Sequence, residues 1–211
     1  MLGLERWEIV YYLTLIASII VHEVAHGVVA YWNGDDTAKR AGRLTLNPIS
    51  HIDPLGSVIL PALAVLGGLP AFGWAKPVPV NPVKLRNRRR DMLLVGLAGP
   101  GTNILLMAVF AVVARSTLDG NPFDDSSSLL GVITFFAASA NLFLAAFNLL
   151  PIPPLDGASL LERLVPARHL GVYYRIAPYG MLIIFGLVFF TDIFGSLVDP
   201  FWERLVDFIV T

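Results

Sequence analysis

The chain has 211 residues, of which 55% are hydrophobic and 15% are charged, and its formal net charge is −1. Soluble domains usually carry about 25% charged residues, so this composition and a mean hydropathy of +0.68 exclude an ordinary soluble domain and predict an all-α polytopic membrane protein. The near-neutral charge offers no basic surface for nucleic acid, and the absence of cysteine excludes disulfides and thiolate metal ligands.

The first apolar segment runs from about Glu5 to Asn33 and is long enough to cross a bilayer. Aromatic residues near both of its ends, Trp7 and Trp32 among them, are typical of the two membrane–water interfaces. No small-residue cleavage site accompanies the apolar run, so we expect it to remain as a membrane span.

Within this span the sequence reads His22-Glu23-Val24-Ala25-His26. Residues four apart lie on one face of an α-helix, so both imidazoles can face a single metal ion. Glu23 can reach a water molecule there without being a ligand. Ionisable groups are costly in hydrocarbon, and a metal site explains them better than an accidental match or a polar cluster that joins helices.

The next stretch, residues 35–54, is polar and rich in turns. The alternating pattern from Arg43 to Leu46 is consistent with a short strand or β-hairpin. Residues 55–69 are apolar but fall short of the roughly 20 residues that a span needs, which favours a re-entrant segment. Prolines make residues 72–82 extended. We interpret the arginines before residue 91 as a topology signal in preference to a lipid head-group site.

Two further spans are predicted at residues 91–115 and 129–150. Pro100 interrupts the first of them and should kink it. Asn103, three residues later, is expected to hydrogen-bond across helices, or else to position substrate.

The C-terminal part is predicted to hold a short helix around residues 159–165, a span at 176–190, and an interfacial helix or short last span at 197–210. The expected fold is therefore about four to six membrane helices with a re-entrant or β-hairpin region. We expect one membrane-embedded domain over 1–211, with a catalytic core at 5–165 and C-terminal helices at 171–211.

Positive charge sets the expected orientation. Loops 34–54, 70–90 and 157–175 are rich in lysine and arginine, and loop 116–128 has neither. The positive-inside rule places the first three loops in the cytoplasm. The sequence thus predicts a multi-pass protein of a bacterial or archaeal plasma membrane, with the histidine pair nearer the cytoplasmic face.

A catalytic zinc site needs three protein ligands and one open position. Without cysteine, the remaining candidates are His51, His169 and a carboxylate. Asp156 follows a proline-rich turn on the same side of the membrane as the histidine pair, although it could instead cap the helix that follows. We expect His51 to be an interfacial loop residue and assign no role to His169.

Three motifs in this order resemble the site-2 protease family of intramembrane zinc metalloproteases: the His22 to His26 motif, Gly99-Pro100-Gly101-Thr102-Asn103, and Asn148 followed by Leu155-Asp156-Gly157. The resemblance covers most of residues 1–160 and is to a small form without a PDZ or CBS domain. It implies that Asp156 completes a site for one Zn²⁺ per chain with His22 and His26. It also implies that Asn148 assists the substrate carbonyl.

The function predicted is a zinc-dependent intramembrane endopeptidase that acts on transmembrane proteins in the lipid bilayer, with Glu23 as general base (regulated intramembrane proteolysis). The alternative is a membrane metal-binding or transport protein without proteolytic activity. A transporter should have a symmetrical pair of repeats, and the sequence has none. An inactive scaffold would be expected to lack Glu23 or a ligand.

Overall fold

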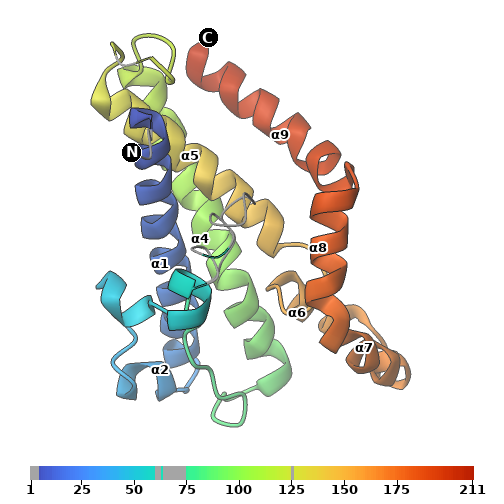
Figure 1. The fold of residues 1–211 in the computed structure, drawn as a ribbon. Coiled ribbons are helices and arrows are strands. Elements are labelled where there is room, and N and C mark those ends of the chain that lie inside the picture. The colour runs from blue at the N-terminus through green and yellow to red at the C-terminus, as the bar shows by residue number, and fades with distance from the viewer. Residues whose placement is uncertain (1–4, 60–62, 64–74, 125) are drawn as a thin grey trace.

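The structure is a computed structural model that describes residues 5–59, 63, 75–124 and 126–211. All regular structure in these residues is helical, as the predicted all-α fold requires (Figure 1). The longer helices are α1 (Arg6–Trp32), α4 (Arg88–Thr117), α5 (Leu129–Asn148), α8 (Gly180–Phe190) and α9 (Ile193–Val210). The shorter ones are α2 (Thr37–Arg40), α6 (Gly157–Leu164), α7 (Leu170–Ile176) and the single turns η1 (Pro48–His51), η2 (Pro54–Ile59), η3 (Ala167–His169) and η4 (Ala177–Tyr179).

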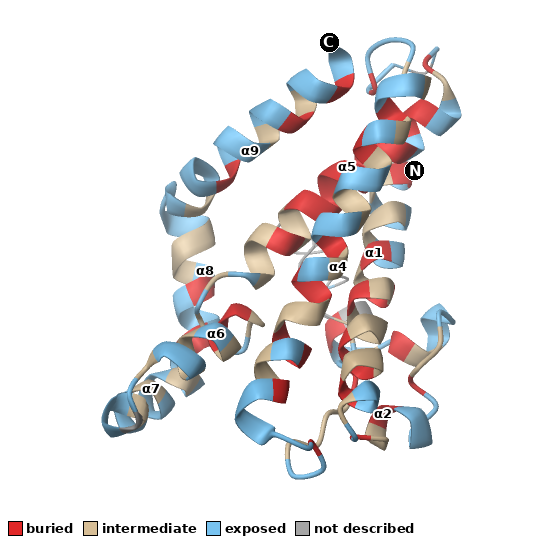
Figure 2. Cartoon of the chain, turned by 180° about the vertical axis from the view of Figure 1, so that it is seen from behind, coloured by how far each residue is buried: buried red, intermediate tan, exposed pale blue. Residues whose placement is uncertain are grey.

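Four segments within the described residues are long and apolar enough to cross a membrane: α1, α4, α5 and the run 170–190 from α7 to α8. The number of spans therefore falls within the predicted range. Of the most apolar window of α5, 67% is buried, against 28% for α1 and for α4, so α5 is the central helix (Figure 2). The outward apolar faces of α1 and α4 are left for lipid.

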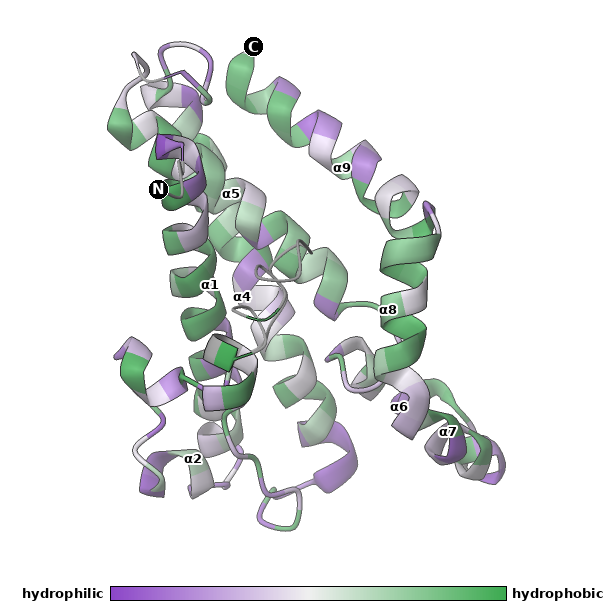
Figure 3. Ribbon diagram, in the orientation of Figure 1, coloured by the Kyte–Doolittle hydropathy of each residue, from purple (hydrophilic) through white to green (hydrophobic). Residues whose placement is uncertain are grey.

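The core lies where α1, α4, α5 and α9 meet, and its buried apolar residues are Val10, Ala111, Ala114, Val132, Phe135, Phe136, Ala138, Leu142, Leu205 and Ile209. Helix α9 joins this core through Trp202, whose ring centroid lies 6.0 Å from that of Phe135 and 5.5 Å from that of Phe143. Figure 3 shows both apolar and polar residues along α9. It is longer than the predicted tail helix at 197–210, and it is not among the four candidate spans.

Helix α4 contains Pro100, the predicted interruption, and is nevertheless one continuous helix. The Asn87 side chain accepts a hydrogen bond from the backbone nitrogen of Arg90 at its start, and Asp91 accepts one from the backbone of Asn87. The helix then continues through Pro100 to Thr117. This continuity matters because it brings Asn103 past Pro100 on the same helix.

The predicted strand at Arg43–Leu46 is not found, and these residues form bends and irregular backbone. The backbone nitrogen of Arg43 donates to the carbonyl of Ala38 in α2, and its buried side chain donates to the carbonyl of Lys76. Local turns thus satisfy backbone groups that a hairpin would have paired. Most of the predicted re-entrant segment 55–69 lies outside the described residues. Residues 75–81 have no helix or strand, as expected for an extended stretch.

Candidate metal centre

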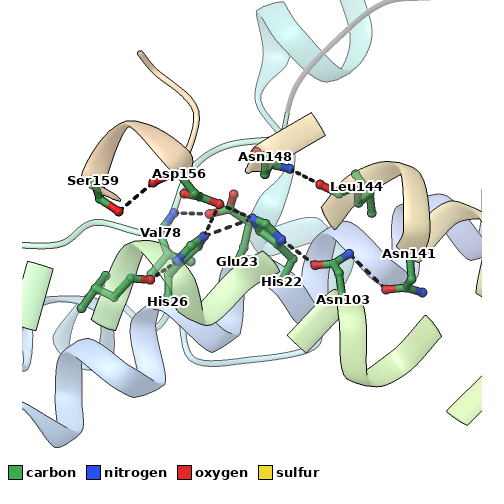
Figure 4. A network of polar contacts seen from close by, with 11 residues as sticks. His22, Glu23, His26, Val78, Asn103, Asn141, Leu144, Asn148, Asp156 and Ser159 are labelled. Atoms are coloured by element: carbon green, nitrogen blue, oxygen red, sulfur yellow. Dashed lines mark hydrogen bonds and ion pairs between the residues drawn. The ribbon is translucent and has the colours of Figure 1, made fainter. Parts of the chain in front are cut away.

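The two imidazoles of α1 lie one helical turn apart and face the same point (Figure 4). Nε2 of His22 and Nε2 of His26 are 3.0 Å from each other, and both residues are buried. The helix itself fixes this spacing, because residues i and i+4 lie on one face.

Asp156 approaches the pair from the turn between α5 and α6. Its Oδ2 lies 3.0 Å from Nε2 of His22 and 3.2 Å from Nε2 of His26. Asp156 does not act as a helix cap, which was the alternative role: it directly precedes α6, but its side chain makes no capping hydrogen bond. The structure thus brings the third predicted ligand, Asp156, to the histidine pair of α1, from which it is far apart in sequence.

The remaining imidazole nitrogens are occupied. Nδ1 of His26 lies 2.6 Å from the backbone carbonyl of Val95, which can only accept, so Nδ1 carries the proton. Nδ1 of His22 lies 2.6 Å from Oδ1 of Asn103. The Nε2 lone pair of a neutral His26 therefore points at the carboxylate of Asp156, and the cluster needs a positive charge at its centre.

That charge can be a proton or a metal ion. Oδ2 of Asp156 is buried and has no hydrogen-bond partner among the described residues, as expected for an atom that meets such a charge. Ligand atoms of the three residues lie within 4.8 Å of one another. Two imidazole nitrogens and a carboxylate oxygen form a donor set that zinc takes in catalytic sites. The residues present therefore fit a divalent metal.

Glu23 and Asn148 line the same cavity, which has a volume of about 380 Å³. Oε2 of Glu23 accepts a hydrogen bond of 2.8 Å from the backbone nitrogen of Val78 in the extended stretch. The amide nitrogen of Asn148 donates to the carbonyl of Leu144 in its own helix, 3.0 Å away. A second hydrogen on that nitrogen is left for another acceptor.

Two other predicted histidines are not brought to this centre. His51 is buried within the protein, and its Nε2 lies 2.8 Å from the carbonyl of Thr45. His169 is exposed in η3. Asn103 contacts His22 and, on its other side, Asn141 of α5, so it does hydrogen-bond across helices.

Sequence reasoning missed two residues of the site. Asn141 is fully buried, and a polar amide in the middle of the apolar run 129–150 was a signal that could have found it. A Cβ on Gly99 would lie 2.5 Å from the Nε2 atoms of both His22 and His26. Gly99 was noticed only as part of a motif, because its importance depends on how closely α4 approaches α1.

Comparison with known proteins relates the chain to a family of zinc metalloproteases. The family model described as "Peptidase family M50" matches residues 123–190. A Bacillus subtilis (strain 168) protein named "Putative zinc metalloprotease YwhC" is 40% identical over 197 residues, which cover 92% of this chain and 84% of the relative. A Mycobacterium tuberculosis (strain ATCC 35801 / TMC 107 / Erdman) protein named "Putative zinc metalloprotease Rip2" is 32% identical over 212 residues, which cover 89% of this chain and 78% of the relative. No solved structure matches the chain at a significant level.

Proposed function

The chain belongs to peptidase family M50, the site-2 protease family, and from this premise we propose that it is a zinc-dependent intramembrane endopeptidase. It hydrolyses peptide bonds in or near the transmembrane helices of membrane-protein substrates. One observation carries the proposal: two imidazoles and a carboxylate converge beside a cavity that a fourth ionisable group, Glu23, also lines. Helix α1, which supplies the imidazoles and Glu23, and helix α5, which leads into the turn that supplies Asp156, are long and apolar enough to span a bilayer.

His22, His26 and Asp156 would hold one zinc ion per chain. Bound zinc supplies a Lewis acid that polarises a carbonyl oxygen and makes a water molecule more acidic. All three residues also line the cavity of about 380 Å³, which would leave room for water and substrate beside the ion, as a catalytic site requires.

Glu23 acts as the general base. It takes a proton from the water that attacks the peptide carbonyl carbon, and it returns this proton to the amine nitrogen as the C–N bond breaks. The hydrogen bond from Val78 holds one carboxylate oxygen in place and leaves the other for the water. The second hydrogen of the Asn148 amide supports the negative charge that develops on the carbonyl oxygen.

The substrate must be extended at the site, because peptide bonds in an intact helix are shielded by their hydrogen bonds. Pro77, Val78 and Val80 of the extended stretch line the cavity and give it one wall of non-helical backbone. Such backbone at membrane level is tolerated where it lines a wet cavity. We assign this wall to substrate binding and to water entry, and residues 1–211 to one peptidase domain.

The decisive experiment compares the wild type with Glu23→Gln in cells that co-express tagged single-pass membrane proteins. Glutamine keeps the shape but cannot take a proton, so cleavage should fall by about 10²–10⁴-fold. Zinc should stay bound, because Glu23 is not among the three ligands. Cleavage at the wild-type rate in Glu23→Gln contradicts the assigned base. Zinc uptake without any cleavage by the wild type favours a metal-binding or transport protein.

A further inference from the structure

We infer that Asn141 and Asn103 act in series as positioning residues that fix the proton of His22 on Nδ1 and so keep its Nε2 lone pair for the metal. This inference rests on the proposed function only in one respect: it takes Nε2 of His22 to be a metal ligand. It is carried by a run of buried hydrogen bonds across three helices, from α5 through α4 to α1 (Figure 4).

The run is anchored on the backbone of α5. Nδ2 of Asn141 lies 2.8 Å from the carbonyl oxygen of Ala137, which can only accept a hydrogen bond. The same nitrogen lies 2.8 Å from Oγ of Ser18, whose own hydrogen goes to the carbonyl of Thr14. Both contacts therefore require the nitrogen of Asn141 on that side, and its oxygen must face the other way, toward Asn103.

Asn103 takes its orientation from Asn141. Its Nδ2 donates to Oδ1 of Asn141 at 3.0 Å, which leaves its Oδ1 facing Nδ1 of His22 at 2.6 Å. An amide oxygen only accepts, so Nδ1 must carry a hydrogen. Asn103 and Asn141 are each 0% exposed, so no solvent can supply a different partner.

The two imidazoles are thus oriented by different means. His26 needs no relay, because a backbone carbonyl, that of Val95, accepts from its Nδ1. His22 depends on a side-chain amide, which can turn over. If the link to Asn141 is lost, Asn103 can present its NH₂ group to Nδ1, and the imidazole then carries its hydrogen on Nε2, where it blocks the metal.

The test measures zinc affinity by competition with a chromophoric chelator on the purified full-length chain in detergent. Removing an outer partner of a metal-ligating histidine typically costs about 10–100-fold in affinity. We expect such a loss in Asn103→Leu and about a tenfold loss in Asn141→Leu. The matched control is Ser139→Ala, a buried site on α5 whose hydroxyl bonds only to Phe135 in its own helix, and there affinity should not change.

A conservative variant separates positioning from packing. Asn103→Asp still accepts from Nδ1 of His22 but loses the donor to Asn141, so it should keep zinc affinity even if it unfolds more easily. Equal losses in Asn103→Asp and Asn103→Leu would overturn the inference. So would wild-type affinity in Asn141→Leu, and if that variant does not fold, the two variants at Asn103 still decide.

A spectroscopic readout follows the proton itself. In zinc-loaded protein with ¹⁵N-labelled histidine, the Nδ1 hydrogen of His22 should give a downfield resonance protected from exchange with water. It should be absent or shifted in Asn103→Leu, while the Nδ1 hydrogen of His26 serves as internal reference; an unchanged His22 resonance refutes the relay. A wild-type chain that binds zinc and shows this resonance but cleaves nothing refutes only the proposed peptidase activity.

Discussion

Single residues set the space available to the metal centre, and Gly99 of α4 is the tightest of them. A side chain there would meet three ring atoms at 2.5 Å, and both metal-facing nitrogens are among them. Contacts this short do not occur for real Cβ atoms, so the imidazoles or the helix must move. The absence of a side chain at residue 99 is therefore a requirement of the site, and it is independent of helix propensity.

Gly99→Ala should lower the zinc content of the purified protein and abolish cleavage, because a methyl group displaces Nε2 of both histidines. Overpacking of this kind also costs about 1–3 kcal/mol of folding free energy. The control is Gly101→Ala, two residues along α4, where nothing lies within 4 Å of the added Cβ. Zinc content measured by atomic absorption should match the wild type there, and an equal loss in both variants would mean that helix effects, not the imidazole contact, are responsible.

At the scale of elements, the extended stretch 75–81 forms a non-helical part of the cavity wall. Two carboxylates, one in α1 and one just after its end, accept hydrogen bonds from its backbone. Glu23 accepts from Val78, and Oδ2 of Asp35 accepts from the backbone nitrogen of Asn81 at 2.6 Å. The other oxygen of Asp35 accepts from Thr37 in α2. Asp35 is 0% exposed, so it ties this wall to the end of α1 from the inside.

Asp35→Asn should lower the free energy of unfolding by about 1–3 kcal/mol, because the new NH₂ group leaves a buried backbone donor without an acceptor. Thermal unfolding in detergent measures the loss. Asp36→Asn is the control: its exposed carboxylate pairs with Arg40 and Lys84 at the surface, and we expect little change there. Comparable losses at both positions would contradict an internal role for Asp35.

The same contacts predict a pH dependence. Burial raises the pKa of the Asp35 carboxyl, but hydrogen bonds from Thr37 and Asn81 and the charge of Lys84 outweigh it, so the pKa in the folded chain is lowered. A lowered pKa means that the stabilisation is complete above the ordinary value of about 3.9 and is lost as the pH falls through the folded value. The difference in Tm between wild type and Asp35→Asn should therefore shrink below about pH 4. A constant difference down to pH 2 would argue against this carboxylate.

At the scale of the whole molecule, the two ends of the helices differ in the positive charge that their loops carry. Figure 1 places the start of α1, the end of α9 and the described ends of the loop between α4 and α5 at one end of the helices, and the start of α4, with its arginines, at the other. We propose that the arginine end faces the cytoplasm, as the positive-inside rule predicts. The candidate metal centre lies nearer that end, because His22 and His26 belong to the last turns of α1.

The chain has no cysteine, so this orientation can be tested without background. A membrane-impermeant maleimide applied to intact cells should label Ser126→Cys, an exposed residue of the loop between α4 and α5. It should not label Val83→Cys, which is 82% exposed beside α4, until the cells are opened. The reverse pattern would put the site nearer the outer face.

Metal binding should also stabilise the assembled helices, since its ligands join α1 to the turn after α5. A ligand that binds only the folded state at 100 times its Kd adds about 2.7 kcal/mol. Removing the metal with a chelator should therefore lower Tm, and added zinc should restore it. His26→Ala should show no response to either treatment, and a response equal to that of the wild type would mean that zinc binds elsewhere.

Sequence alone determined the features that depend on local periodicity and composition. The apolar runs predicted α1, α4, α5 and the span that ends at Phe190, and the four-residue spacing of His22 and His26 predicted their common face. The resemblance in motifs singled out Asp156, which the chemistry of the residues had left as one candidate among several. The helix predictions and the common face of the two histidines are confirmed because hydrocarbon requires long apolar helices, and because a helix fixes its own i and i+4 neighbours.

Only the tertiary structure decided which helix faces meet. The contact of Gly99 with the imidazoles and the path from Ala137 through Asn141 and Asn103 to His22 join residues of three helices. No pattern within one helix contains this information, because in a membrane the outward faces are as apolar as the inward ones. Rotation and register are set by close packing and by a few buried hydrogen bonds, and these exist only once the helices are together.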